Sequence, residues 1–383
     1  MKRKITVTTG TRADYGLLRK TIRLIDSNKK LELYLLVTGM HLSKKHGETI
    51  NEIKQDGFKI FKKFPGLPKN DDLFHTSLAL GEQITKFSKI FHEIKPDINL
   101  VLGDRDEMLA SSLAASHMNI PNAHIHGGDK TRAGIDENNR HSITKISHIH
   151  FVATKKSKER VLRMGENPKY IFLTGSPNVD EIKQNRITLK NELNKKYSID
   201  IRGNEILLVF HPVTTQINST KQQIKKILNV LKNLEKTTIA IAPNSDAGNE
   251  IIFKELKNFS KKNPFFHYFK NVPRNDFLGF LNNMGVLLGN SSAGMIEASY
   301  FSIGVVNLGI RQKGREHGKN VINVEQIDEK PIYNAIQKLL TMKKNNKLLS
   351  STIYGTGNSS KKIVEILEKI PITDDLISKQ IQY

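Results

Sequence analysis

The sequence predicts an α/β fold made of two Rossmann-like, doubly wound domains that face a central cleft. Short apolar runs alternate with helical patterns along the chain, which is typical of parallel βαβ units. At 383 residues the chain is too long for one typical hydrophobic core. The strand pattern also pauses once, near the middle of the sequence, as expected between two domains.

The first half of the chain contains six apolar runs that we expect to be strands. After the first run, Leu18, Ile22 and Ile25 recur at helical spacing and predict a helix over residues 17–28. Further helical patterns extend to Ile53 and to His117. The expected strands cover residues 4–8, 33–38, 97–102, 123–126, 148–153 and 171–174.

The second half repeats the alternation after residues 176–204, which hold no long apolar run. Its expected strands cover residues 205–210, 238–242, 265–269, 285–288 and 305–308. We therefore predict an N-terminal Rossmann-like domain over residues 1–176 and a C-terminal one over residues 177–358. The amphipathic helix within residues 359–383 is expected to pack back on the N-terminal domain.

Composition excludes several classes of protein. The net charge is +22, but lysines are interspersed with acidic residues along helices, which indicates a solvated surface rather than a nucleic-acid site. The absence of cysteine excludes disulfides and thiolate metal sites. No apolar run approaches the roughly 20 residues of a membrane span, and the N-terminus looks like a first strand rather than a signal peptide. We expect a cytoplasmic protein with no membrane or nucleic-acid partner.

Carboxylates follow the strand ends of the first half. Asp104 lies in LGDRDE, Asp129 in HIHGGD, and Asp136 and Glu137 in GIDENNRH. The carboxyl ends of parallel strands meet at one edge of a sheet, so these groups should converge. Neighbouring carboxylates can take different pKa values, so that one acts as a base and another as an acid. The alternative for Asp104 or Asp136 is a helix N-cap.

A metal site is a competing interpretation for the histidines of the same segments. His124, His126, Asp129 and His141 could in principle supply ligands. Histidines on a strand beside two glycines are more often packed or hydrogen-bonded, so we predict no metal.

Groups suited to phosphate or a nucleotide lie mainly in the second half. In the first half, Gly10-Thr11-Arg12 opens a helix whose N-terminus could bind phosphate, with Arg12 as a forked donor. No dinucleotide fingerprint and no P-loop sequence is present. The expected contacts of the second half are His211, the small-residue loop with Ser291, Ser292 and Gly294, the nearby Glu297, and Arg311, with Arg315 as a further cation.

These motifs together resemble the UDP-N-acetylglucosamine 2-epimerase family, in particular its hydrolysing branch, which supplies N-acetylmannosamine for sialic acid synthesis. The resemblance implies a fold similar to the GT-B glycosyltransferases. It extends over about residues 5 to 321. The segments that carry it are TGTRADYG, VTGMHLSKKHGETI, LGDRDE, HIHGGDKTRAGIDENNRHSITKISHIHF, FHPVT and GNSSAGMIEASYFSIGVVNLGIRQKGR.

The resemblance also implies a reaction. A base removes the C2 proton of UDP-N-acetylglucosamine while UDP leaves C1, and water then adds to 2-acetamidoglucal to give N-acetylmannosamine. Asp104, Asp129 and the pair Asp136 and Glu137 match catalytic positions, although the second carboxylate is often Glu in the family. Arg12 and His211 match residues near the diphosphate. Ser291, Ser292 and Glu297 match the nucleotide-binding loop. No cofactor is implied, and a homodimer or tetramer is expected.

Three alternatives remain open at the level of sequence. The same reaction could act on UDP-N,N′-diacetylbacillosamine for legionaminic acid synthesis, because no residue reports on the C4 and C6 substituents. A GT-B glycosyltransferase would need fewer carboxylates at its site. A nucleic-acid binder would draw on the positive net charge alone.

Overall fold

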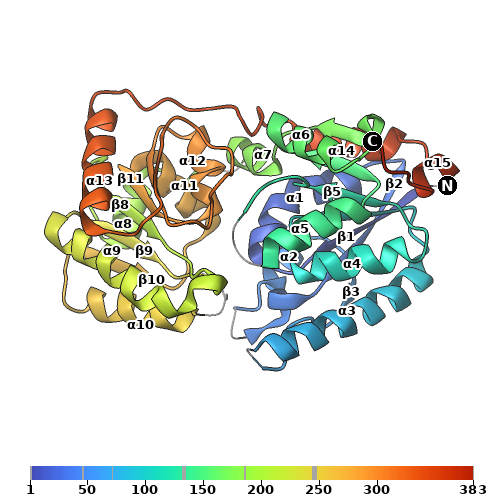
Figure 1. Ribbon diagram of the computed structural model, residues 1–383, viewed down its shortest axis with the longest axis horizontal. Helices are drawn as coiled ribbons and strands as arrows, with labels where there is room; N and C mark the ends of the chain where they lie inside the picture. Colours follow the sequence, from blue (N-terminus) through green and yellow to red (C-terminus); the bar gives the residue numbers. More distant parts are fainter. Residues whose placement is uncertain are drawn as a thin grey trace. The chain divides into compact units, whose positions relative to one another are not determined.

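The computed structural model describes residues 2–44, 47–70, 72–131, 135–184, 187–243 and 248–382 (Figure 1). The chain divides into two compact units. The N-terminal unit comprises residues 1–129, 135–181 and 355–383, and the C-terminal unit comprises residues 130–134 and 182–354. The predicted domain limits and the predicted central cleft stay predictions. Among the described residues, no helix combines the length and the apolar content that a membrane crossing requires.

The N-terminal unit is built on a seven-stranded sheet in the order β3-β2-β1-β4-β5-β6-β7. Every neighbouring pair of strands in it is parallel. The strands are β1 Arg3–Thr9, β2 Leu31–Val37, β3 Ile60–Lys63, β4 Ile98–Leu102, β5 Asn122–Ile125, β6 Ile149–Val152 and β7 Ile171–Leu173.

Helices connect these strands, as expected for crossovers between parallel neighbours. Short 3₁₀ segments are η1 Gly39–Leu42 and η3 Pro168–Tyr170. The helices are α1 Arg12–Asp26, α2 Ile50–Gln55, α3 Leu73–Ile94, α4 Asp106–Ser116, α5 Ile135–Ile146, α6 Lys155–Arg163, α7 Pro177–Gln184, α14 Ser359–Lys369 and α15 Asp374–Ile377.

The sheet is apolar on both faces because helices cover both of them. Val7 and Leu35 pack on one face with α1 and α14. Leu36 packs on the other face with Phe87 of α3 and Ala110 of α4. The C-terminal helices thus complete the core of the unit that contains the first strand (Figure 1).

The C-terminal unit has a six-stranded parallel sheet in the order β10-β9-β8-β11-β12-β13. Its strands are β8 Ile206–Val209, β9 Thr238–Ile241, β10 Phe266–Phe269, β11 Val286–Gly289, β12 Gly304–Leu308 and β13 Val321–Val324. Its helical segments are α8 Lys190–Tyr197, η4 Thr214–Ser219, α9 Thr220–Leu234, α10 Asn249–Ser260, α11 Arg274–Asn283, η5 Ser292–Gly294, α12 Glu297–Tyr300 and α13 Glu329–Lys344.

The predicted fold class of two parallel, doubly wound sheets is confirmed. The edge strands β3 and β13 were not predicted, because β3 ends in two exposed lysines and β13 is only partly buried. The first helix begins at Arg12, as the Gly10-Thr11-Arg12 motif indicates, whereas apolar spacing alone indicates a start at Leu17. Its start is set by a capping box between Thr11 and Asp14, which apolar spacing does not reveal.

Gly289, the last residue of β11, provides a test of the second sheet. Its φ is 143°, and a Cβ atom there would overlap the carbonyl group of Val209 on β8. We expect Gly289→Ala to lower the free energy of unfolding by more than about 3 kcal/mol, measured by urea denaturation.

The matched control is Gly81→Ala, because Gly81 lies on α3, where a Cβ atom would meet no other atom within 4 Å. Helix propensity predicts a gain of roughly 0.5–1 kcal/mol there. Equal effects of the two substitutions would contradict the close approach of β11 to β8.

Candidate active site

Asp104 lies just beyond the carboxyl end of β4, and a buried arginine fixes its position. Arg140 on α5 donates through Nη2 to Asp104 Oδ2 and through Nη1 to the carbonyl oxygen of His126, at 3.2 Å for the second contact. The Arg140 side chain is 5% exposed, whereas that of Asp104 is 19% exposed. The carboxylate is thus held firmly and still accessible. It does not cap α4, whose N-cap residue is Arg105.

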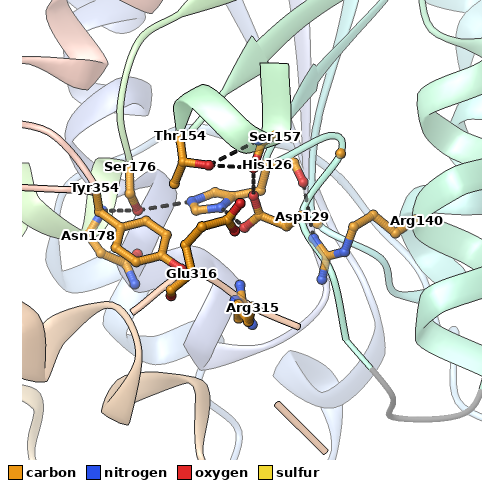
Figure 2. Close-up of polar contacts among 12 residues, drawn as sticks. His126, Asp129, Arg140, Thr154, Ser157, Ser176, Asn178, Arg315, Glu316 and Tyr354 are labelled. Carbon is orange, nitrogen blue, oxygen red and sulfur yellow. Dashed lines mark hydrogen bonds and ion pairs between the residues drawn. The ribbon is translucent and has the colours of Figure 1, made fainter. Parts of the chain in front are cut away.

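Asp129 follows β5 and is completely buried. Its Oδ1 accepts a hydrogen bond of 2.7 Å from the Ser157 hydroxyl, and its Oδ2 lies 2.8 Å from His126 Nδ1. His126 Nε2 lies 2.9 Å from Ser176 Oγ on the other side of the ring (Figure 2). Both carboxylate oxygens of Asp129 therefore bond to protein groups.

Asp136 and Glu137 occupy the first turn of α5, and both are partly exposed. Glu137 Oε1 lies 3.0 Å from His141 Nε2, one helical turn further on. The charge of Asp136 acts on Arg105: the pKa of Arg105 is raised mainly by Glu107, and also by Asp14 and Asp136. Asp136 therefore interacts with Arg105, which directly follows Asp104 in the chain.

A further carboxylate, that of Asp14, was missed by the sequence analysis and lies in the first turn of α1, just after β1. Asp14 is buried and accepts hydrogen bonds from the backbone N–H groups of Gly10 and Thr11 and from the Thr9 hydroxyl. Burial raises the pKa of Asp14 to about 6, and the nearby Glu107 adds to the shift. The Thr-x-x-Asp spacing of a capping box is the sequence signal that could have identified it.

This arrangement changes the phosphate interpretation of the first turn. The amides of Gly10 and Thr11 bond to the Asp14 carboxylate, so they are not directed at a ligand. Arg12 Nε forms an ion pair of 2.9 Å with Glu52 Oε1, and the Arg12 side chain is 28% exposed. The role of this turn in substrate binding stays a prediction, with Arg12 as its cationic group.

Glu107 is a second buried carboxylate beside this turn. It lies against Gly10 and Gly39, where added Cβ atoms would overlap its side chain. Arg105 Nε donates to Glu107 Oε2 at 3.2 Å, which compensates part of the cost of burying the charge. His41, also buried, lies 2.9 Å from Thr9 Oγ1, and burial lowers the pKa of His41 to about 4.

In the C-terminal unit, His211 and Asn290 join the carboxyl ends of β8 and β11. The His211 N–H donates to Asn290 Oδ1 at 2.7 Å, and Asn290 Nδ2 donates back to the His211 carbonyl at 2.8 Å. Burial, with a smaller effect of Arg311, lowers the pKa of His211 to about 3. The imidazole is therefore neutral near pH 7 in this structure.

The small-residue loop is ordered by short-range contacts. Ser291 Oγ accepts a hydrogen bond of 3.3 Å from the Ala293 N–H at the start of η5. Gly294 is buried against Val305, so a larger residue would not fit. Ser292 is partly buried in η5. The next α-helix, α12, begins at Glu297 and is a single turn.

Glu297 and Arg311 hold the surroundings of this loop. Arg274, a residue the sequence analysis missed, donates to Glu297 Oε1 at 3.0 Å. Glu297 Oε2 is buried and has no hydrogen-bond partner in the described part of the chain. Arg311 Nη1 donates to the Asn290 carbonyl at 3.4 Å, and Gln312 donates to the same oxygen at 3.1 Å.

The histidines considered as metal ligands bond to protein groups instead. His124 Nε2 lies 2.7 Å from the Gly103 carbonyl, and its Nδ1 lies 3.2 Å from Thr144 Oγ1. His126 bonds to Asp129 and Ser176 as above. Across the described residues, no group of three or more His, Asp or Glu side chains is arranged to hold a metal ion.

The two parallel sheets have a GT-B-like fold. The chain belongs to the UDP-N-acetylglucosamine 2-epimerase family, whose sequence profile matches residues 23–368. The family resemblance inferred from the motifs is thereby confirmed.

Two curated relatives and one solved structure illustrate the relationship. The chain is 39% identical, over 99% of both sequences, to a hydrolysing UDP-N,N′-diacetylbacillosamine 2-epimerase of Legionella pneumophila. It is 36% identical, over 85% of both sequences, to a hydrolysing GDP/UDP-N,N′-diacetylbacillosamine 2-epimerase of Campylobacter jejuni. The crystal structure of Neisseria meningitidis UDP-GlcNAc 2-epimerase bound to UDP-GlcNAc superposes with a TM-score of 0.82, at 20% identity, over 96% of this chain and 100% of that one.

Buried neutral histidines predict a specific response to acid. Burial lowers the pKa of His124 to about 3 and that of His41 to about 4, below the ordinary value of 6.5. The unfolded chain therefore binds protons that the folded protein does not. We expect the free energy of unfolding to fall as pH decreases from 6.5 toward 4, by up to about 1.4 kcal/mol per pH unit for each such histidine.

Urea denaturation of the wild type and of His124→Gln at pH 7, 6 and 5 measures this effect. On acidification, the free energy of unfolding of the variant should fall less steeply, by the slope that corresponds to about one proton. Asp14, whose pKa is raised, has the opposite sign between pH 4 and 6 but contributes equally to both proteins. Identical slopes would show that His124 is protonated in the folded state.

Proposed function

We propose that this protein is a hydrolysing 2-epimerase that converts a UDP-linked 2-acetamido sugar and water into the free 2-epimeric sugar and UDP. The observation that carries the proposal is the accessible Asp104 carboxylate, fixed by buried Arg140 at the carboxyl edge of the N-terminal sheet. This chain also aligns along 99% of its length with a relative named for such a reaction.

The proposed chemistry has two halves. A base takes the C2 proton, the C2–H electron pair forms the C1=C2 double bond, and the C1–O electron pair leaves with UDP. Water then bonds to C1 and a proton returns to C2 on the opposite face. General acid–base groups contribute roughly 10²–10⁴-fold each to steps of this kind. Asp104, with Asp136 and Glu137 nearby, supplies carboxylates for proton transfer in this proposal.

We assign nucleotide binding to the C-terminal unit. In this proposal, the neutral His211 ring and the hydroxyl groups of Ser291 and Ser292 donate hydrogen bonds to the diphosphate. The buried free oxygen of Glu297 is suited to a ribose hydroxyl, because an unpartnered buried carboxylate oxygen gains from a donor. Arg311, which lies beside the same loop, adds positive charge for the diphosphate.

The sugar has two candidates. UDP-N-acetylglucosamine is the substrate expected from the motif set, with N-acetylmannosamine as the product. UDP-N,N′-diacetylbacillosamine is favoured by the names of the Legionella and Campylobacter relatives. A cytoplasmic location and a homodimer or tetramer remain part of this proposal, with no nucleic-acid or membrane partner.

Proton NMR in deuterated water with each UDP-sugar tests the reaction. We expect UDP and a free 2-epimeric sugar that carries deuterium at C2. A UDP-linked epimer as product would contradict hydrolysis, and acceptor-dependent UDP release would favour a glycosyltransferase. Turnover of one sugar and not the other identifies the substrate.

In the same assay, we expect Asp104→Asn to lower kcat/KM by roughly 10²–10⁴-fold without loss of folding, because the amide cannot take up a proton. Asp97→Asn is the matched control. Asp97 precedes β4 at the opposite end of the same strand, where it accepts a hydrogen bond from the Lys4 N–H. A variant of Asp104 as active as the control would remove this residue from the mechanism.

Calorimetric titration with UDP tests the C-terminal unit. Glu297→Gln should raise the Kd for UDP at least tenfold, because a neutral amide oxygen is a weaker acceptor than a carboxylate. Glu325→Gln, which removes an exposed partner of Lys313 in the same unit, should leave the Kd within about twofold. Equal affinities of the two variants would exclude Glu297 from the nucleotide site.

A further inference from the structure

His126 is held in an unusual conformation at the carboxyl end of β5. Its φ is +67°, a region that residues other than glycine seldom adopt. The His126 N–H donates to the Phe151 carbonyl at 3.1 Å, and its own carbonyl accepts from Arg140. Such backbone strain persists only where surrounding contacts enforce it, and it is concentrated at functional sites.

The His126 ring belongs to a chain of hydrogen-bonded polar side chains, between Asp129 and Ser176 (Figure 2). A carboxylate is a hydrogen-bond acceptor, so the ring presents a proton on Nδ1 to Asp129 Oδ2. That leaves the lone pair on Nε2, which accepts the Ser176 hydroxyl proton at 2.9 Å. Asp129 is oriented in turn by Ser157, and Ser157 by Thr154 at 2.9 Å.

Both titratable groups of this chain of side chains are buried, and their hydrogen-bond partners distinguish them. The side chain of Asp129 is 1% exposed and that of His126 is 4% exposed. Asp129 already has Ser157 and His126 on its two oxygens. Both oxygens of Asp129 are bonded within this chain of side chains, whereas His126 Nε2, at its end, bonds to the neutral hydroxyl of Ser176.

Epimerisation through a planar intermediate needs one proton-transfer group on each face of the sugar. Asp104 is one accessible group at this sheet edge. Arg140 contacts both the Asp104 carboxylate and the His126 backbone, so it fixes the ends of β4 and β5 relative to each other. His126 is thus a second group, of a different chemical type, held in the same framework.

We propose that His126 is the base of the elimination step and that Asp129 is its positioning residue. This inference rests on the proposed function. Nε2 takes the C2 proton, the C2–H electron pair forms the C1=C2 double bond, and the C1–O electrons depart with UDP. The Asp129 carboxylate stabilises the resulting imidazolium through Nδ1–H. The proton that returns to C2 on the opposite face comes from another group, so addition of water does not require His126.

The test compares two half-reactions in His126→Gln. UDP release from the UDP-sugar that the wild type turns over should fall at least 100-fold in kcat, with KM changed less than threefold. Hydration of added 2-acetamidoglucal in the presence of UDP should stay within tenfold of the wild type. A purely structural role of His126 would lower both rates together and would overturn the inference.

Asp129→Asn provides an independent measurement if the first variant does not fold. The amide donates to Nδ1 and moves the ring proton to Nε2, so we expect the same loss of UDP release with hydration retained. His124→Gln is the matched control on the same strand, with UDP release within fivefold of the wild type. Undiminished UDP release in either His126→Gln or Asp129→Asn overturns the inference and leaves the proposed function intact. A wild type without turnover overturns both.

Discussion

The buried guanidinium of Arg140 is the interaction on which the proposed catalytic edge depends. One arm of its planar fork bonds to the Asp104 carboxylate and the other to the His126 backbone. Burying a cation is costly, and this cost is offset only because a carboxylate and a carbonyl oxygen lie at the two arms. The fork thereby couples α5 to the ends of β4 and β5. A lysine, whose charge is a single point on a flexible side chain, would not orient both of these groups at once.

Burial then determines the proton states around this framework. His41 and His124 stay neutral because their charged forms would lose hydration, whereas the same effect favours the protonated form of Asp14. The N-terminal sheet edge therefore combines neutral histidines with one carboxyl group, that of Asp14, whose pKa is raised to about 6. The C-terminal edge is different: its neutral His211 and hydroxyl-rich loop offer hydrogen-bond donors. This contrast fits the proposed reaction, in which the N-terminal unit transfers protons and the C-terminal unit binds the UDP leaving group.

The sequence predicted the two sheets, their parallel strands and the family, because apolar runs and motifs can be recognised in short stretches of sequence. The roles of Asp104, Asp136, Glu137 and Glu297 stay predictions. The hydrogen bonds of Asp129 could not be predicted from HIHGGD, since one of them comes from Ser157, which is 28 residues away in the chain. The Ser176–His126 contact joins residues 50 apart. Contacts between residues so far apart in the chain produce no periodic pattern in the sequence.

The return of α14 to the first unit has a consequence for biosynthesis. Ile363 and Leu367 belong to the same core as Ile5 and Val7, so the earliest strand and one of the latest helices must meet to complete it. The C-terminal unit, by contrast, is almost continuous in the chain. During translation the C-terminal unit can therefore begin to fold while apolar surface of the N-terminal unit stays exposed until α14 has been synthesised. We therefore expect chaperones to bind mainly to the N-terminal unit, which is synthesised first.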